Sequence, residues 1–207
     1  MECLLCSSSE VHVHPNMNQF CSCIHCKTTF RDPISFISRT AEKLRYEKHN
    51  NDVEDVGYQQ FVSPIVQAVV RDFSNRHSGL DFGAGTGPVI AKLLTDRGFD
   101  IALYDPFFHP NHETLQKKYD FIICCEVIEH FHNPLKEFEL LQSMLKANGK
   151  LYCMTALLPK TEKFANWYYK DDPTHVIFYS PENLGWIKDK IGFKKLNIDG
   201  RLVVFDD

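Results

Sequence analysis

Apolar positions in residues 56–207 alternate between short continuous runs and stripes with helical spacing. The continuous runs are typical of buried strands and lie at residues 80–82, 101–104, 121–125 and 150–155. Apolar residues three and four positions apart separate these runs and predict helices at 63–77, 89–97 and 134–148. Because strands that alternate with helices form βαβ units, the pattern predicts an open, mostly parallel α/β sheet.

The two ends of the chain differ from this central pattern. Ser180-Pro181-Glu182 begins the last predicted helix, and two apolar segments at 193–198 and 202–205 predict a terminal antiparallel hairpin. Residues 31–55 are polar and charged, which indicates a linker or a surface helix. We therefore expect three parts, namely residues 1–30, the connecting segment 31–55, and an α/β domain at 56–207.

The first part carries a cysteine pattern that is typical of a zinc ribbon. Sixteen residues separate Cys3-x-x-Cys6 from Cys23-x-x-Cys26, and each pair can direct two thiolates to one ion. We predict a structural Zn²⁺ held by Cys3, Cys6, Cys23 and Cys26, which would leave no open position for catalysis. Cys21 and three histidines remain as alternative ligands, and two unrelated cysteine pairs in a loose tail are the competing interpretation.

A glycine-rich turn at residues 83–87 indicates a ligand site. Its three glycines allow the backbone to turn and to approach a ligand without a Cβ atom in the way. Asp81 precedes the turn, where its negative charge disfavours a diphosphate. Asp105 ends the next predicted strand, where a carboxylate can accept both hydroxyl groups of a ribose. The pattern favours a cationic ligand that carries a ribose but no phosphate.

Three stretches resemble class I S-adenosylmethionine-dependent methyltransferases, namely LDFGAGTG at 80–87, YDP at 104–106 and FIICCEVIEHF at 121–131. The resemblance covers residues 61–207 and implies a Rossmann-like sheet with S-adenosyl-L-methionine as the cofactor. It places the cofactor site at Asp81, Phe82, Gly83, Ala84, Gly85, Tyr104, Asp105, Pro106 and Glu126.

The interval after Asp105 is shorter than the resemblance implies. Such methyltransferases have a helix, a further strand and an adenine-contacting acidic residue in this interval. Only residues 106–119 are available here, so we expect the sheet to lack one edge strand. The residue that contacts the adenine stays open.

An E-x-x-E-H cluster, formed by Glu126, Glu129 and His130, follows the third strand, and His175 would come from a neighbouring loop. The set resembles that of metal-assisted small-RNA 2′-O-methyltransferases and of ubiquinone-pathway O-methyltransferases, which implies a site that holds a hydroxylate near the methyl group. Three roles stay open: binding of Mg²⁺ by all four residues, general-base catalysis by His130, or a structural role. The candidate catalytic residues are His130, Glu129 and His175.

Composition narrows the class of acceptor. The net charge is −4 and the sequence pI is about 6.2, so there is no global basic field to attract RNA or DNA. No apolar run approaches the roughly 18 residues of a membrane span, and we expect a cytoplasmic protein without a membrane partner. Aromatic residues in the long loop 156–174 are either a lid over a planar acceptor or a cap on the sheet.

These observations predict an enzyme that methylates a small molecule, with O-methylation favoured over C- or N-methylation. An RNA methyltransferase, a sugar C-methyltransferase and a non-enzymatic module that binds zinc and S-adenosylmethionine are the alternatives. Asp81 and Pro88 disfavour a nicotinamide oxidoreductase. The oligomeric state does not follow from the sequence.

Overall fold

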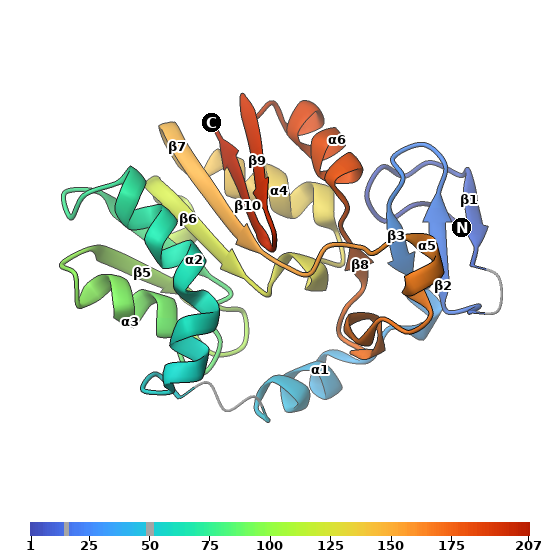
Figure 1. Ribbon diagram of the computed structural model, residues 1–207, viewed down its shortest axis with the longest axis horizontal. Coiled ribbons are helices and arrows are strands. Elements are labelled where there is room, and N and C mark those ends of the chain that lie inside the picture. The colour runs from blue at the N-terminus through green and yellow to red at the C-terminus, as the bar shows by residue number, and fades with distance from the viewer. Residues whose placement is uncertain (15–16, 49–51) are drawn as a thin grey trace.

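A computed structural model describes residues 1–14, 17–48 and 52–207 of the chain. Within these residues the chain forms a six-stranded sheet and a four-stranded sheet (Figure 1). The large sheet has the strand order β5-β4-β6-β7-β10-β9. Its strands are β4 (Ser78–Phe82), β5 (Asp100–Tyr104), β6 (Tyr119–Cys125), β7 (Leu145–Met154), β9 (Lys195–Asp199) and β10 (Leu202–Asp206).

The large sheet confirms the predicted α/β fold. Strands β5, β4, β6 and β7 are parallel, whereas β10 pairs antiparallel with both β7 and β9. The segment between β5 and β6 contains a 3₁₀ turn at His112–Gln116 and no strand. Strand β5 therefore lies at the edge of the sheet, which lacks the additional edge strand, as the short interval predicts.

Helices cover both faces of this sheet (Figure 1). Phe121 and Ile123 of β6 pack in one apolar cluster with α2 (Val56–Asp72) and α3 (Val89–Thr95). Ile122 and Cys124, which alternate with them, pack in the other cluster with α4 (Pro134–Ser143) and α6 (Pro181–Ile191). Because both faces of the strand are buried, its sequence is a continuous apolar run and not an alternating one.

Helix α2 begins earlier than its sequence predicts. The prediction placed the start at Ser63-Pro64, but the helix begins at Val56 and contains Pro64. Asp55 provides the cap, because its carboxylate accepts hydrogen bonds from the N–H groups of Gly57 at 2.7 Å and Tyr58 at 3.2 Å. The prediction was wrong because packing and this earlier cap outweigh the backbone hydrogen bond that a proline removes.

Helix α4 ends at Ser143 and not at residue 148 as predicted. Residues after Met144 join β7 instead, with an irregularity in which Leu145 pairs with Tyr119 and Lys150 pairs with Phe121. The looped-out residues include Asn148, whose φ of +63° is left-handed. The Asn-Gly pair therefore marks a bulge inside the strand and not the end of the helix.

The small sheet combines three N-terminal strands with one strand from the segment before α6. It has the order β1-β2-β3-β8, with β1 (Val11–Val13), β2 (Phe20–Cys23), β3 (Thr29–Arg31) and β8 (Ile177–Phe178). Thr29 pairs with Phe178 and Phe30 pairs with Ile177 in antiparallel register. The N-terminal segment is thus joined to a loop more than 140 residues later, which no local pattern predicts.

The remaining elements are short. Helix α1 (Arg39–Tyr46) occupies part of the connecting segment and buries none of its residues. Helix α5 (Thr161–Phe164) and 3₁₀ turns at Pro33–Ser35, Ile128–His130 and Tyr168–Asp171 complete the described chain. None of the described helices is long and apolar enough to cross a membrane.

Candidate active site

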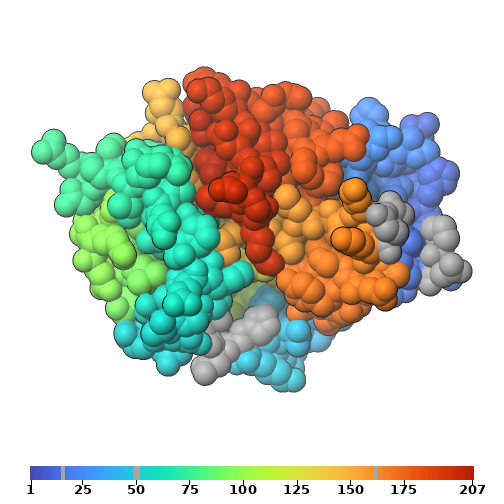
Figure 2. Space-filling view, viewed as in Figure 1, coloured from blue at the N-terminus to red at the C-terminus, as the bar shows by residue number. Residues whose placement is uncertain are grey.

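A cavity with a volume of about 1220 Å³ lies at the carboxyl ends of β4, β5 and β6. Its lining includes the glycine turn after β4, residues 104–108 after β5 and residues 125–127 after β6. Helix α1 and residues 168–175 also contribute to its wall. Figure 2 shows a recess in the surface where α2, α1 and the segment before β8 meet. Ligands of open α/β sheets bind at this edge.

The glycine turn needs glycine for both conformation and space. Gly83 and Gly85 have φ angles of +81° and +63°, which are left-handed and disfavoured for other residues. The N–H of Gly83 donates to the carbonyl of Tyr104 at 2.8 Å, which fixes the turn against β5. A Cβ atom on Gly83 would lie 2.4 Å from a methyl carbon of Val127. The backbone therefore lies directly against the segment that follows β6.

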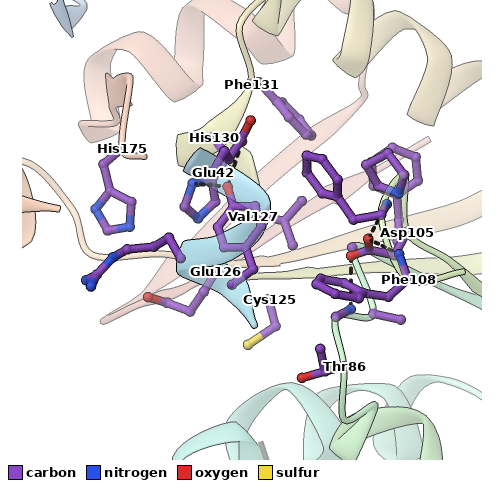
Figure 3. A pocket seen from close by; sticks show the side chains of 18 of the residues that line it. Glu42, Thr86, Asp105, Phe108, Cys125, Glu126, Val127, His130, Phe131 and His175 are labelled. Carbon is purple, nitrogen blue, oxygen red and sulfur yellow. Dashed lines mark hydrogen bonds between the residues drawn. The ribbon is translucent and has the colours of Figure 1, made fainter. Parts of the chain in front are cut away.

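Asp105 is held by the backbone on both of its oxygens (Figure 3). Oδ2 accepts the N–H of Gly85 at 3.0 Å, and Oδ1 accepts the N–H groups of Phe107 at 2.8 Å and Phe108 at 3.0 Å. These three bonds fix the orientation of the carboxylate beside the cavity.

Asp81 is a buried carboxyl group that lines the same cavity. Burial raises its pKa to about 7 and the charge of Asp105 adds to this effect, whereas a hydrogen bond from the Ala91 backbone opposes it. A positively charged ligand would favour the ionised form of this group. The site therefore has a carboxyl group whose charge depends on what occupies the cavity.

Glu126 is bound by an arginine that sequence reasoning did not find. Its Oε1 accepts from Nη2 of Arg201 at 2.6 Å, and its Oε2 lies 3.1 Å from the hydroxyl oxygen of Tyr169. Arg201 lies in the turn between β9 and β10. The backbone of Glu126 has a φ of +53°, uncommon for a residue with a side chain. Burial nevertheless raises the pKa of Glu126 to about 7, with the charge of Glu129 as the second cause.

Glu129 is 0% exposed and lies in the 3₁₀ turn after β6. Its Oε1 accepts a short hydrogen bond from the hydroxyl of Tyr169, which is also 3.1 Å from the hydroxyl of Thr155. Among the described residues, its Oε2 is buried and has no hydrogen-bond partner. Burial raises the pKa of Glu129 to about 7. The free oxygen is an acceptor that a bound ion or proton would satisfy.

Both histidines of the predicted site have a defined tautomer. Nδ1 of His130 lies 2.9 Å from the carbonyl of Thr174, and Nδ1 of His175 lies 2.7 Å from the carbonyl of Tyr169. Because a carbonyl oxygen only accepts, Nδ1 carries the proton in each ring and Nε2 is left with a lone pair. Burial lowers both pKa values, that of His175 to about 3 with His130 as a further cause. Both rings are therefore neutral at neutral pH.

The cavity brings most of the predicted site residues together (Figure 3). All of the predicted cofactor residues line it, as do His130 and His175, whereas Glu129 lies behind its wall. Glu129, His130 and His175 each place one donor atom within 4.8 Å of the others. Glu126 is not in this group, since its carboxylate is occupied by Arg201 and Tyr169.

Two further contributors come from helix α1. The hydroxyl of Tyr46 donates to Glu42 at 2.8 Å and lies 3.0 Å from Nδ1 of His130. Neither residue belongs to a recognisable motif, and the polar composition of this segment gave no sign that it reaches the cavity. The aromatic residues of the loop 156–174 have different roles. The hydroxyl of Tyr169 contacts the carboxyl groups of Glu126 and Glu129, whereas Trp167 packs against Phe178.

The four N-terminal cysteines form a separate cluster. Their sulfur atoms lie within 4.8 Å of one another, with Cys3 and Cys26 3.5 Å apart and Cys6 and Cys23 3.6 Å apart. A tetrahedral Zn²⁺ with Zn–S bonds of about 2.3 Å needs sulfur atoms about 3.8 Å apart. The donor type and the spacing both fit a structural zinc ion. The fifth cysteine, Cys21, is buried outside this group.

Comparison with known protein families identifies a methyltransferase domain in the chain. The sequence profile described as "Methyltransferase domain" matches residues 27–198. No curated protein matches the sequence.

Solved structures with the same fold share little sequence with the chain. A SAM-dependent methyltransferase from Archaeoglobus fulgidus is 16% identical with a TM-score of 0.57, and the match covers 72% of this chain and 94% of that one. Magnesium protoporphyrin IX methyltransferase from Synechocystis, with bound SAH, is 16% identical with a TM-score of 0.51 over 82% and 94% of the two chains. An O-methyltransferase family protein from Burkholderia thailandensis is 11% identical with a TM-score of 0.54, and the match covers 80% of this chain and 61% of that one.

Proposed function

The chain belongs to the methyltransferase domain family, and on this premise we propose that it transfers a methyl group from S-adenosyl-L-methionine to a hydroxyl group of a small molecule. The observation that carries the proposal is a single cavity that joins Asp81 and the tethered Asp105 to two neutral histidines. Direct transfer requires a cofactor site and a nucleophile site that share one enclosed space.

Three features support the cofactor end of the cavity. Asp105 has a fixed carboxylate, and Oδ2, which accepts a single backbone N–H, can also accept a ribose hydroxyl. Asp81 supplies negative charge to a cationic ligand, and the left-handed glycine turn lines the wall of the same cavity. The cofactor, when bound, supplies a methyl group on a positively charged sulfur, and the carbon–sulfur bond breaks with its electron pair left on sulfur.

The acceptor end contains a base. Nε2 of His130 has a free lone pair and can take the proton of an acceptor hydroxyl as the oxygen attacks the methyl carbon. The Thr174 carbonyl keeps the other nitrogen protonated and so holds the ring in the basic tautomer. The net charge of −4 favours a small acceptor over an RNA.

We also propose two metal assignments. Zn²⁺ at the four cysteines would stabilise the N-terminal segment, because such a site binds only when the ligands are brought together by folding. The Mg²⁺ predicted at Glu126, Glu129, His130 and His175 stays a prediction, and the three of these residues whose donor atoms cluster are Glu129, His130 and His175. Two imidazole nitrogens and one carboxylate favour an ion such as Co²⁺, Mn²⁺ or Zn²⁺, because Mg²⁺ prefers oxygen ligands.

Cobalt titration separates the metal-binding role from the general-base role. If the histidine group binds metal, zinc-replete protein takes up about one Co²⁺ without thiolate-to-cobalt absorption bands. His175→Ala then loses this ion, whereas His77→Ala, at a partly exposed histidine that does not line the cavity, keeps it. Equal uptake by both variants, or none by the wild type, would rule out metal binding at these residues.

Calorimetric titration of S-adenosylhomocysteine tests the proposed function. We expect a dissociation constant on the order of micromolar, followed by methyl transfer from S-adenosylmethionine in a screen of phenols, catechols and sugars. Absence of binding to the folded protein would overturn the proposal. Binding without transfer to any nucleophile would instead favour the non-enzymatic module.

The affinity for S-adenosylmethionine should fall as the pH drops below about 7. Asp81 must be ionised to pair with a cation, and its pKa in the free protein is raised by burial to about 7. The dissociation constant should therefore rise by up to about tenfold per pH unit below this value. Asp81→Asn should bind weakly with a flat profile. An equally steep profile in that variant would assign the titration to another group, such as Glu126.

A further inference from the structure

The last residue of β3 reaches across to the segment that carries His175. We define residues 168–178 as the catalytic loop. Arg31 is 8% exposed, and its Nη2 donates to the carbonyls of Lys170 at 2.7 Å and Asp172 at 3.2 Å. Its Nε donates to the carbonyl of His175 at 3.2 Å. One guanidinium therefore holds three carbonyl groups of this loop.

The backbone of Arg31 makes the same connection. Its N–H donates to the carbonyl of Val176 at 2.8 Å, next to the β3–β8 pairs. Within the loop, the carbonyl of Tyr169 accepts from Nδ1 of His175. The guanidinium thus holds the chain on both sides of the hydrogen bond that sets the tautomer of His175.

On its other side, Arg31 contacts the β2–β3 hairpin, which carries two of the four clustered cysteines. Strand β3 pairs with β2 so that Arg31 lies opposite Phe20, and the guanidinium lies 4.9 Å from the centre of that ring. Cys23 ends β2, and its N–H donates to the carbonyl of Thr28 at 2.9 Å, which closes the turn that contains Cys26. A metal ion at the cysteines would therefore hold the hairpin from which Arg31 extends.

We propose that Arg31 is a positioning residue that couples the four-cysteine site to the catalytic loop. The ion never touches the cavity, yet the order that it imposes on β2 and β3 reaches His175 through the guanidinium. Removing either the ion or the guanidinium leaves buried carbonyls of the loop without donors, so the loop reorganises. Asp81 and Asp105, which belong to the large sheet, keep their positions. The assignment of His175 as a site residue rests on the proposed function, whereas the coupling itself does not.

Amide hydrogen exchange followed by mass spectrometry tests this coupling without a methyl acceptor. In the wild-type protein, removal of zinc should raise the exchange of residues 168–178 by about tenfold or more, whereas residues 80–95 should change little. Arg31→Met should give the same pattern with zinc retained. Arg97→Met removes an exposed guanidinium that donates to the carbonyl of Leu93, and should leave both regions unchanged.

Nitrogen-15 spectra of the histidine rings provide a readout specific to the site. In Arg31→Met and in zinc-free protein, His175 should lose its hydrogen bond to the Tyr169 carbonyl, and the nitrogen-15 signals that report its tautomer should change. Arg31→Lys should partly restore the wild-type signals. Unchanged loop exchange and His175 signals after zinc removal would overturn the proposal, and so would an unchanged loop in a folded Arg31→Met protein. Failure of the wild type to bind S-adenosylhomocysteine would overturn the proposed function but leave the coupling intact.

Discussion

Replacing Asp105 with alanine should weaken S-adenosylhomocysteine binding by about 100-fold or more. A hydrogen bond from a ribose hydroxyl to the charged carboxylate contributes roughly 1.5–3 kcal/mol, and a loss of about 3 kcal/mol corresponds to a factor above 100. The substitution also leaves the N–H groups of Gly85, Phe107 and Phe108 without their acceptor. Calorimetry on both proteins gives the ratio.

Two comparisons make this result specific. Asp100→Ala changes an exposed aspartate at the start of the same strand and should bind as the wild type does. Asp105→Asn keeps an oxygen for Phe107 and Phe108 but can present an amide to the N–H of Gly85, so an intermediate affinity is expected. Binding by a folded Asp105→Ala protein within about threefold of the wild type would show that the ribose is held elsewhere.

Replacing Cys26 with serine should abolish zinc binding and unfold the N-terminal hairpin. Zinc at four thiolates contributes on the order of 10 kcal/mol to the folding of small domains, and serine cannot replace a thiolate ligand. We expect metal analysis to fall from about one zinc per chain to nearly none. Amide exchange in residues 1–30 should rise toward that of an unfolded peptide.

Cys21→Ala provides the matched control for this experiment. Cys21 is buried, as three of the four clustered cysteines are, and belongs to the same strand as Cys23, but lies outside the sulfur cluster. This variant should therefore retain zinc. Zinc retained by Cys26→Ser and lost by Cys21→Ala would show that Cys21, and not Cys26, is a zinc ligand.

The sequence predicts the features that depend on neighbouring residues. Continuous apolar runs identify the buried strands because both faces of the large sheet are covered. The glycine turn and Asp105 follow from residues only a few positions apart, since a βα turn is a local structure. The alternation of strands and helices predicts a mostly parallel sheet with a terminal hairpin, but not the order of its strands.

Features that depend on distant contacts were not predictable. Arg201 reaches Glu126 across 75 positions, and nothing beside it in the sequence indicates an ion pair. Strand β8 has two residues and exists because β3 pairs with it. Pro64 misled the prediction for a related reason, because the packing of Val62, Ile65 and Val66 in the core decides where α2 runs.

The attachment of helix α1 beside the cavity should depend on ionic strength. The helix buries no residue of its own, and it reaches the catalytic loop through an ion pair between Arg45 and Asp172 at 2.6 Å and through the contact of Tyr46 with His130. An ion pair that is partly exposed contributes only about 0–1 kcal/mol and is screened by salt. Higher salt should therefore weaken the attachment of α1 to the loop beside His130, whereas the apolar core that carries Asp105 should not respond.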